Sequence, residues 1–355
     1  MTLIIAEAGV NHNGDKNVAF QLVDAAYYAG ADIVKFQTFR AQKLASKNAK
    51  KADYQLKNTE KMESQYEMLK RLELPLEMHF QLKRYCQDLG IEFLSTAFDE
   101  DSLKFLVDDL GLQRLKLPSG ELTNSPLVLA HAQTGCDLIV STGMASLAEI
   151  EEALGVIAFG YLYKDKKSPC KSGFKEAYSS TEGQKILSKK VTLLHCTTEY
   201  PTPMNEINLN VMDSFKGAFG LKVGYSDHSQ GIAVPIAAAT KGAAIIEKHF
   251  TLSRAMDGPD HKASLEPSEL KSMVDAVRDI ELALGTSVKA PTLSEVKNKN
   301  IARKSLIALK KISKGEKFTS DNITTKRPGG GIDPINYWDV LGTPALKEYE
   351  EDDLL

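Results

Sequence analysis

The strongest constraint on the fold of this chain is an alternation, repeated eight times, between short β-rich runs and stretches with helical periodicity. Most runs end in polar residues or glycine and precede apolar residues that recur at every third or fourth position, as on one face of a helix. Strands that alternate with helices pair in parallel. The runs are residues 3–11, 32–39, 92–98, 115–120, 137–143, 191–200, 222–228 and 244–250.

Eight such units within the first 285 residues predict an α/β fold, the (β/α)8 or TIM barrel, whose usual length is about 250 residues. Helix boundaries fall where this architecture needs them. Asp15 and Gly30 bracket the first predicted helix, and Ser146 and Glu149 form a capping box before another. We therefore expect a barrel domain over residues 1–285.

Four further segments are distinguished by their composition. Residues 40–75 are rich in lysine, glutamine and asparagine, and we expect a long loop at the mouth of the barrel. Residues 159–190 are polar and glycine-interrupted, and we interpret them as an accessory excursion on the far face. Residues 286–300 lose the periodicity and predict a linker. Residues 301–355 are β-leaning with turn signals, which predicts a small second domain that is rich in β structure.

Composition and charge exclude several classes of function. A net charge of -3 and a pI near 6.2 give no basic surface for nucleic acid. No apolar run approaches the roughly 20 residues that cross a bilayer, and the N-terminus lacks the features of a signal peptide. The four cysteines are scattered without a CxxC pair, which fits a reducing compartment and predicts a cytoplasmic protein.

The chemistry of a TIM barrel lies where the carboxyl ends of its strands meet, because the interior below them is packed. Side chains of a strand alternate between its two faces, so residues two positions apart point the same way. Inward-pointing pairs are therefore expected at three strand ends: Lys35 with Gln37, Ser226 with His228, and Glu247 with His249.

Two histidines at neighbouring strand ends predict a metal site. The seventh and eighth runs should lie about 4.8 Å apart, which lets His228 and His249 reach one ion. With only two imidazoles and nearby carboxylates, that ion keeps several waters, which favours Mn²⁺ or a similar divalent metal over a closed zinc site. The alternative is that each histidine is a hydrogen-bonded core residue.

Two lysines inside the mouth predict an anion site, since a buried ammonium group needs an anionic partner. With the hydroxyl groups of Thr96, Ser119 and Ser226, they would cradle a ligand that carries a phosphate and a carboxylate. These lysines are Lys35 and Lys116. Two alternatives stay open, namely a Schiff-base lysine of the aldolase type and salt bridges to Glu7, Glu121 or Glu247.

The chain also carries ten short motifs in a fixed order. They are IIAEAGVNHNGD, VKFQTF, FLSTAFDEDS, LPSGE, STGM, LLHCTTEYPTP, GYSDHSQG, EKHFT, GPDHKASLEP and KRPGGG. In their order and approximate spacing, over essentially the whole chain, these motifs resemble the sialic acid synthase family, bacterial enzymes that make nine-carbon 2-keto sugar acids.

The resemblance implies a TIM barrel followed by a small antifreeze-like domain of the β-clip type. It implies the condensation of phosphoenolpyruvate with an N-acylated hexosamine, an aldehyde of the N-acetylmannosamine type, to give N-acetylneuraminate and phosphate by C–O cleavage. It further implies Mn²⁺ or another divalent metal as cofactor. Relatives of this kind are domain-swapped homodimers in which the small domain covers the partner's active site.

The family's site residues carry over position by position. His228 and His249 would hold the metal; Lys35, Thr96, Lys116, Ser119 and Ser226 would contact phosphoenolpyruvate; Glu7, Gln37, Glu121, Tyr200 and Asp260 would face the sugar or the reacting carbons; and Arg327 would come from the other subunit. Thr198 stands where some members have an asparagine that contacts phosphoenolpyruvate. Asn58 is our assignment for a sugar-contacting asparagine of the 40–75 segment.

The expected catalytic groups are two carboxylates and two lysines. Glu7 and Glu247 would steer a proton or the attacking water, and Lys35 and Lys116 would favour departure of the phosphate electrostatically.

Three competing functions remain open at this point. The first is the same reaction on 2,4-diacetamido-2,4,6-trideoxymannose, which gives N,N'-diacetyllegionaminate, and the quoted motifs do not separate it from N-acetylneuraminate synthesis. The second is a Schiff-base aldolase. The third belongs to another class, a non-catalytic carbohydrate-binding protein, which would leave the lysines and histidines of the mouth without a purpose.

Overall fold

Eight parallel strands close into a barrel, each hydrogen-bonded to the next in chain order, with β1 pairing to β8. The computed structural model describes residues 1–59 and 63–355. The predicted TIM barrel is confirmed, and each strand lies within its predicted run or within one residue of it. The strands are β1 Leu3–Gly9, β2 Ile33–Thr38, β3 Glu92–Ala97, β4 Arg114–Leu117, β5 Asp137–Ser141, β6 Val191–His195, β7 Lys222–Asp227 and β8 Ile245–His249.

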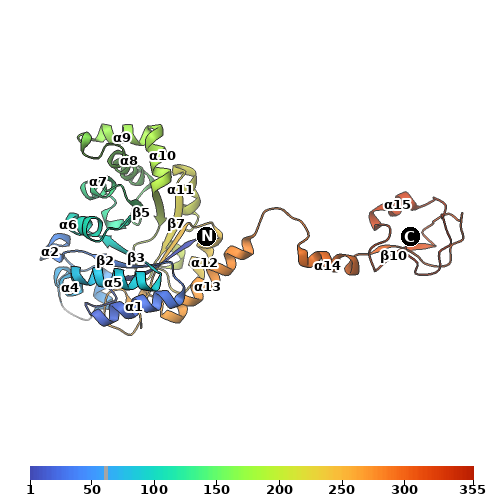
Figure 1. Cartoon of the computed structure of the whole chain (residues 1–355), viewed down its shortest axis with the longest axis horizontal. Helices are drawn as coiled ribbons and strands as arrows, with labels where there is room; N and C mark the ends of the chain where they lie inside the picture. The colour runs from blue at the N-terminus through green and yellow to red at the C-terminus, as the bar shows by residue number, and fades with distance from the viewer. Residues whose placement is uncertain (60–62) are drawn as a thin grey trace. The chain divides into compact units, whose positions relative to one another are not determined.

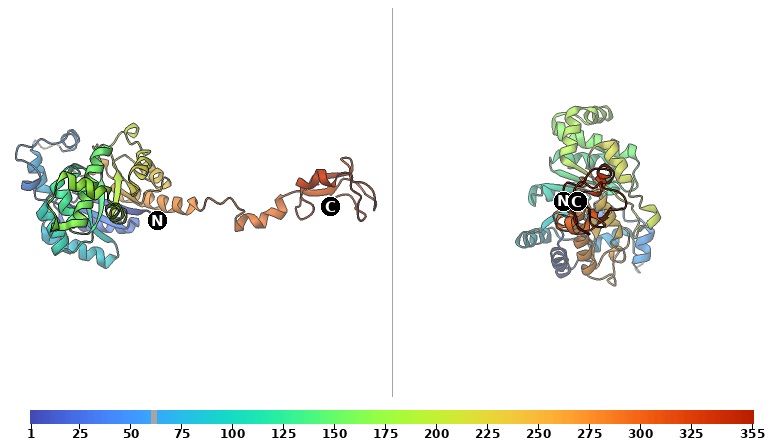
Figure 2. Two further views of the ribbon diagram at one scale, coloured as in Figure 1. Left: turned by 90° about the horizontal axis from the view of Figure 1, so that it is seen from above. Right: turned by 90° about the vertical axis from the view of Figure 1, so that its right-hand side faces the viewer.

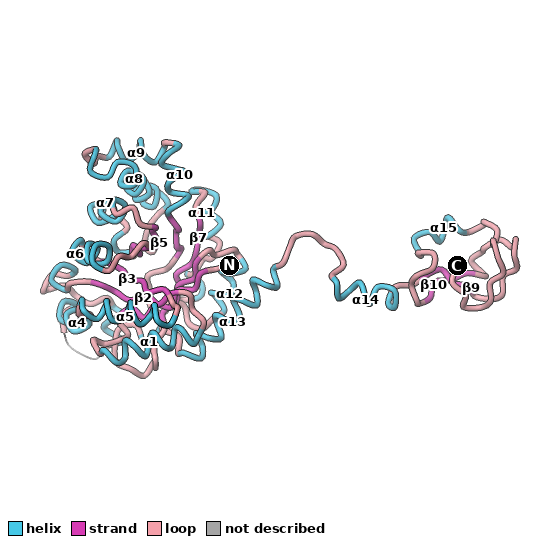
Figure 3. Tube along the Cα trace, in the orientation of Figure 1, coloured by secondary structure: helices cyan, strands magenta, loops and turns pink. Residues whose placement is uncertain are grey.

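Helices surround the barrel, so that the strands form an inner layer and the helices an outer one (Figures 1 and 3). Asp15 caps the first helix by accepting from the backbone N–H groups of Asn17 and Val18, and Gly30 ends it in the left-handed conformation, as predicted. The helices of this layer are α1 Lys16–Ala29, α5 Leu76–Leu89, α6 Glu100–Lys104, α7 Ser125–Gln133, α8 Leu147–Tyr163, α11 Val211–Phe219, α12 Ala233–Thr240 and α13 Pro267–Leu284.

The segment predicted as a long loop at the mouth holds three short helices, α2 Ala41–Leu44, α3 Asp53–Asn58 and α4 Gln65–Leu72. A capping box between Ser64 and Glu67 starts the last of them. Met68 and Leu72 are buried on its inner side. The expectation of a loop was wrong here because a buried apolar face on a short helix leaves little periodicity in a sequence dominated by polar residues.

The segment predicted as an accessory excursion is also helical. Its first residues complete α8, and α9 Lys171–Ser179 and α10 Thr181–Lys190 follow and lie beside α8 (Figures 1 and 2). The rings of Phe159 and Phe174 meet edge to face, with centroids 5.2 Å apart. Glycine at 173 permits this approach, since a Cβ there would lie 3.0 Å from the Phe159 ring. The segment therefore thickens the outer layer of the barrel.

The chain divides into two units, Met1–Gly285 with the barrel and Thr286–Leu355. In the second unit, α14 Leu293–Ala302 occupies much of the segment expected to be a linker. Thr292 caps it in a capping box with Glu295, a helix-start signal that the loss of periodicity concealed. Beyond it, the antiparallel strands β9 Ser305–Ala308 and β10 Ile323–Lys326 and the short α15 Tyr337–Val340 surround a small apolar core.

Among the described residues, no helix combines the length and the apolar character that a membrane span requires.

Candidate active site

The carboxyl ends of the strands open into a pocket of about 390 Å³. The sequence-predicted site residues of the barrel line it, with the exception of Asn58: Glu7, Lys35, Gln37, Thr96, Lys116, Ser119, Glu121, Thr198, Tyr200, Ser226, His228, Glu247, His249 and Asp260. Arg327 lies in the second unit, where it is exposed and its Nε donates to the carbonyl of Ala302 at 2.9 Å.

The polar pocket rests on an apolar layer of the barrel interior. Six buried side chains form that layer: Ile5, Ile33, Leu94, Ile139, Leu194 and Ile245. Each of these six residues is followed, two positions later and on the same inward face, by a residue that lines the pocket. These pocket residues are Glu7, Lys35, Thr96, Ser141, Cys196 and Glu247. The sealed apolar layer and the polar site are therefore separated by a single inward-facing position on each of these strands.

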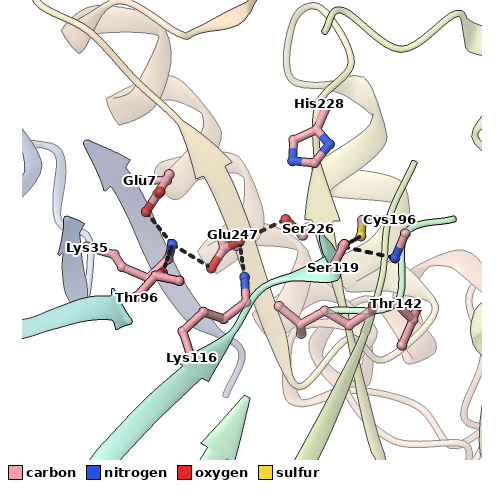
Figure 4. A network of polar contacts seen from close by, with 12 residues as sticks. Glu7, Lys35, Thr96, Lys116, Ser119, Thr142, Cys196, Ser226, His228 and Glu247 are labelled. Carbon is pink, nitrogen blue, oxygen red and sulfur yellow. Dashed lines mark hydrogen bonds and ion pairs between the residues drawn. The ribbon is translucent and has the colours of Figure 1, made fainter. Parts of the chain in front are cut away.

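Four buried charged side chains, Glu7, Lys35, Lys116 and Glu247, form what we call the charged floor of the pocket (Figure 4). Lys116 Nζ donates to Glu247 Oε1 at 2.7 Å. Lys35 Nζ lies 2.6 Å from Glu7 Oε2 and 3.6 Å from Glu247 Oε2. Glu247 therefore sits between two ammonium groups. Of the three carboxylates considered as salt-bridge partners of the lysines, Glu7 and Glu247 are the ones that the structure pairs with them.

Burial and neighbouring charges set the protonation of the charged floor. Burial would raise the pKa of Glu247, but Lys116 and Lys35 outweigh it and hold that pKa well below its usual range. Burial raises the pKa of Glu7 to about 7 despite Lys35, and the charge of Glu247 adds to the rise. Glu247 is thus ionised at neutral pH, whereas Glu7 is able to hold or release a proton there.

The pKa values of the two lysines also shift in opposite directions. Burial tends to lower both pKa values, and it prevails at Lys116. At Lys35 the carboxylates of Glu247 and Glu7 outweigh burial and raise the pKa. Lys35 is therefore firmly cationic, since it faces two carboxylates rather than one.

Hydroxyl and amide groups complete the floor. Ser226 Oγ donates to Glu247 Oε1 at 2.8 Å, and Thr96 Oγ1 accepts from Lys35 Nζ at 3.1 Å. Gln37 Nε2 approaches Glu7 Oε1 at 3.4 Å. These contacts orient the charged side chains, because each one adds a hydrogen bond to a carboxylate or ammonium group that is already held in an ion pair.

A second set of hydroxyl groups lies where the ends of β4, β5 and β6 meet. The backbone N–H of Gly143 donates to Ser119 Oγ at 3.0 Å, and that oxygen lies 3.2 Å from Cys196 Sγ. Thr198 Oγ1 is buried and has no hydrogen-bond partner within the described ranges. A Cβ at position 143 would lie 2.3 Å from Thr198 Oγ1, so glycine is required for this packing.

The two predicted metal-binding histidines lie together above the ends of β7 and β8. The ring centroids of His228 and His249 are 5.6 Å apart. Tyr200 packs on both rings, with its centroid 4.1 Å from that of His228 and 5.7 Å from that of His249. The expectation that the two imidazoles share one environment is therefore met by the geometry.

The nitrogen atoms of these histidines suit a metal ion. His228 Nδ1 contacts the carbonyl of Thr197 at 2.6 Å, a bond that requires its N–H there and leaves Nε2 as a lone-pair donor. His249 Nδ1 is buried without a hydrogen-bond partner in the part of the chain that the structure describes. Burial lowers the pKa of His228 to about 4 and holds that of His249 well below its usual range, so both rings are neutral, as metal ligands must be.

Protein groups supply only two of the ligands that such an ion needs. Among residues 1–59 and 63–355, no group of three or more His, Cys, Asp or Glu side chains is arranged to hold a metal. An ion held by the two imidazoles would therefore take its remaining partners from water or substrate.

A fully buried ion pair fixes the strand ends that carry the histidines. Lys248 Nζ lies 2.6 Å from Asp227 Oδ2 and also donates to the carbonyl of Ser229. Asp227 Oδ1 accepts from the backbone N–H of Ser229 at 2.9 Å. These residues neighbour His228 and His249 in the chain, so the pair restricts the positions of both imidazoles.

Two residues assigned from the resemblance have other partners. Asn58 does not line the pocket, since its Nδ2 donates to the carbonyl of Pro259 at 2.8 Å and joins α3 to the loop that carries Asp260. Its Nδ2 is therefore used by the protein itself, and a contact of Asn58 with the sugar stays a prediction. Glu121 lines the pocket and accepts from Asn124 Nδ2 at 2.6 Å.

Several pocket residues were missed by sequence reasoning. Ser141 and Cys196 were given no role in the site, although the alternation of β5 and β6 places both at the pocket. The side chains of α2, α3 and α4 had no comparable signal, because their helices were not predicted. These are Leu44, Gln55, Gln65, Met68, Leu69 and Leu72, which we call the uncharged wall.

Comparison with known proteins gives two family matches. The model of the NeuB family matches residues 22–289, and that of the SAF domain matches residues 303–355.

Individual relatives are similar over nearly their whole length. An N,N'-diacetyllegionaminic acid synthase of Campylobacter jejuni is 51% identical over 100% of this chain and 98% of that protein. One from Legionella pneumophila is 43% identical over 96% and 89%. The crystal structure of an N-acetylneuraminic acid synthetase from Leptospira borgpetersenii is 32% identical, with a TM-score of 0.66 over 84% of this chain and 90% of that one.

Asp260 generates a prediction about stability. Burial raises its pKa from 3.8 to about 6, so between these values the folded chain holds a proton that the unfolded chain has released. The free energy of unfolding therefore falls as pH rises through this range. Asp260→Asn should raise it by about 3 kcal/mol at pH 7.5 and by progressively less toward pH 4.

Urea unfolding across this pH range measures the effect. Asp257→Asn, an exposed acid of the same loop, is the matched control and should change stability little at any pH. A stability gain for Asp260→Asn that does not depend on pH would contradict the assigned cause.

Proposed function

The chain belongs to the NeuB family, and from this premise we propose that it condenses phosphoenolpyruvate with 2,4-diacetamido-2,4,6-trideoxymannose. The products are N,N'-diacetyllegionaminate and inorganic phosphate. The observation that carries the proposal is the meeting of two lysines, two glutamates and two histidines in one pocket, on a chain 51% identical to a diacetyllegionaminic acid synthase.

The choice of sugar rests on the relatives. Two proteins named N,N'-diacetyllegionaminic acid synthase are 51% and 43% identical to this chain, whereas the N-acetylneuraminic acid synthetase is 32% identical. This order favours the diacetamido sugar over N-acetylmannosamine, the sugar expected first from the resemblance. N-acetylneuraminate synthesis is therefore the second candidate.

The charged floor binds the phosphoenolpyruvate anion in this proposal. Lys35 and Lys116 supply positive charge in a buried site, where charge-assisted hydrogen bonds are strong. The hydroxyl groups of Thr96, Ser119 and Ser226 surround the same space. They would fix the carboxylate and phosphate so that carbon 3 of phosphoenolpyruvate faces the sugar aldehyde.

The reaction consumes one water and breaks one C–O bond. Carbon 3 of phosphoenolpyruvate attacks the aldehyde carbon, the aldehyde oxygen takes a proton, and water adds at carbon 2. The phosphate then leaves with the former enol oxygen, and carbon 2 becomes the keto group. Glu7 is our candidate for the group that passes these protons, since its pKa lies near 7. Lys116 and Lys35 would stabilise the departing phosphate.

We assign the metal to His228 and His249. A divalent ion there, Mn²⁺ in our proposal, supplies Lewis-acid polarisation of the sugar aldehyde when it is bound. Tyr200 and the pair of Asp227 with Lys248 keep the two imidazoles in position.

A Schiff-base aldolase and a non-catalytic carbohydrate-binding protein receive less support. A Schiff base requires an uncharged amine, and the carboxylates of Glu247 and Glu7 raise the pKa of Lys35, which favours its ammonium form. Burial lowers the pKa of Lys116, but its Nζ is held in a hydrogen bond to Glu247 Oε1 at 2.7 Å. A carbohydrate-binding protein without activity has no need of four buried charges, which are costly to desolvate.

Two further expectations remain proposals. We propose a domain-swapped homodimer in which Arg327 reaches the partner's sugar, and this rests on the resemblance alone. We also propose that the enzyme works in the cytoplasm, which is supported by four cysteines that are all free.

The direct test of function is turnover by the full chain. With phosphoenolpyruvate, Mn²⁺ and 2,4-diacetamido-2,4,6-trideoxymannose, phosphate release should equal formation of a product with the mass of N,N'-diacetyllegionaminate. N-acetylmannosamine is the comparison sugar. Preferred turnover of N-acetylmannosamine would select the second candidate, and no phosphate release with either sugar would refute a synthase.

The metal assignment predicts a loss of both binding and activity. Chelation should abolish turnover and added Mn²⁺ should restore it. The double variant His228→Ala, His249→Ala should neither bind Mn²⁺, as followed by electron paramagnetic resonance, nor turn over. His195→Gln is the control, because that ring lies outside the pocket and bonds the carbonyl of Ile207. Unchanged Mn²⁺ binding by the double variant would disprove the assignment.

A further inference from the structure

The pocket has two chemically different sides. The charged floor carries two ammonium and two carboxyl groups. The opposite chemistry is found in the uncharged wall. It consists of the leucine, methionine and glutamine side chains that line the pocket from the described residues of α2 to α4. A ligand that fits both sides has an anionic end and an uncharged, partly apolar end.

The apolar part of the uncharged wall is built into the fold. Met68 and Leu72 are buried in a small cluster with Val10 and Phe39, apart from the main core, and Leu44 and Leu69 pack against it. Gln65, Met68, Leu69 and Leu72 recur at helical spacing, so one face of α4 is turned to the pocket. This backing holds Leu69 at the pocket surface.

Several charged residues of the same segment interact with one another rather than with the pocket. Lys51 Nζ lies 3.5 Å from Glu63 and donates to Thr59 at 2.9 Å, and Arg71 pairs with Glu63 at 3.0 Å. Although the segment is rich in charge, its described pocket-lining residues are neutral. A sugar that presents hydroxyl groups here would bury them against leucine side chains, at a cost in free energy.

The orientation of the sugar follows from the reaction. The aldehyde carbon must lie at the charged floor, where it meets carbon 3 of phosphoenolpyruvate. The far end of the sugar chain is then left to face the uncharged wall. A methyl group at carbon 6 suits Leu44 and Leu69, and an acetamido group at carbon 4 suits the amide of Gln65.

We propose that the uncharged wall selects the sugar by its far end, and that Leu69 and Leu44 are the specificity-determining residues, favouring a 6-deoxy sugar over one with a hydroxymethyl group. This inference rests on the proposed function. One added hydroxyl group is discriminated by about 100-fold at most in an apolar pocket, which sets the scale of the contribution from carbon 6. N-acetylmannosamine also differs from the trideoxy sugar at carbon 4, so the variants are judged by the change in the ratio of the two sugars.

The test compares kcat/KM for 2,4-diacetamido-2,4,6-trideoxymannose and N-acetylmannosamine in matched variants. Leu69→Gln should lower the ratio of the two values about tenfold or more, mainly through the KM of the trideoxy sugar, with the KM of phosphoenolpyruvate unchanged. Leu69→Met should keep the wild-type ratio. Leu56→Gln, an exposed leucine of α3 outside the pocket, is the control and should keep it too.

Leu44→Gln is an independent variant on another helix. If Leu69→Gln fails to fold, Leu44→Gln alone tests whether the uncharged wall selects the sugar. Its ratio should shift in the same direction. An active wild-type enzyme whose folded Leu69→Gln and Leu44→Gln variants keep the ratio would overturn the inference while leaving the proposed function intact. A wild-type chain that releases no phosphate with either sugar would overturn the proposed function, and the selection with it.

Discussion

The placement of Glu247 between two lysines is the interaction on which the rest of the site depends. Its carboxylate accepts from Lys116 at 2.7 Å and lies 3.6 Å from Lys35, and Glu7 pairs with Lys35 from the other side. Desolvating four charges is expensive, and ion pairs recover that cost only when their geometry is good. Because apolar residues would fill the same space more cheaply, we interpret the charged floor as a feature kept for binding and catalysis.

The barrel supplies what such a network needs. The apolar layer of Ile5, Ile33 and their neighbours seals the interior directly beneath the charges, so water reaches them from the pocket side alone. The strands hold each side chain at a fixed height, and the pair of Asp227 and Lys248 fixes the neighbouring histidines. A site held this rigidly is organised before its ligand arrives, which is the condition for electrostatic stabilisation of a departing phosphate.

The sequence predicted the barrel and the inward-facing pairs well, because both follow from period-two alternation and from the rule that strand ends converge. It did not decide between salt bridges and an anion cradle, since Lys116 and Glu247 are 131 residues apart and only folding shows that they touch. The uncharged wall was missed because α4 is short and its buried face is only Met68 and Leu72. The contact of Asn58 with the carbonyl of Pro259 could not be predicted either, because the two residues are 201 positions apart in the chain.

Calorimetric titration of phosphoenolpyruvate into the full chain tests most directly whether the charged floor binds this anion. Lys116→Met should weaken binding by about 10- to 100-fold, as expected for loss of a charge-assisted contact, whereas Lys104→Met on the exposed side of α6 should leave binding unchanged. An unaltered dissociation constant for a folded Lys116→Met variant would contradict the account.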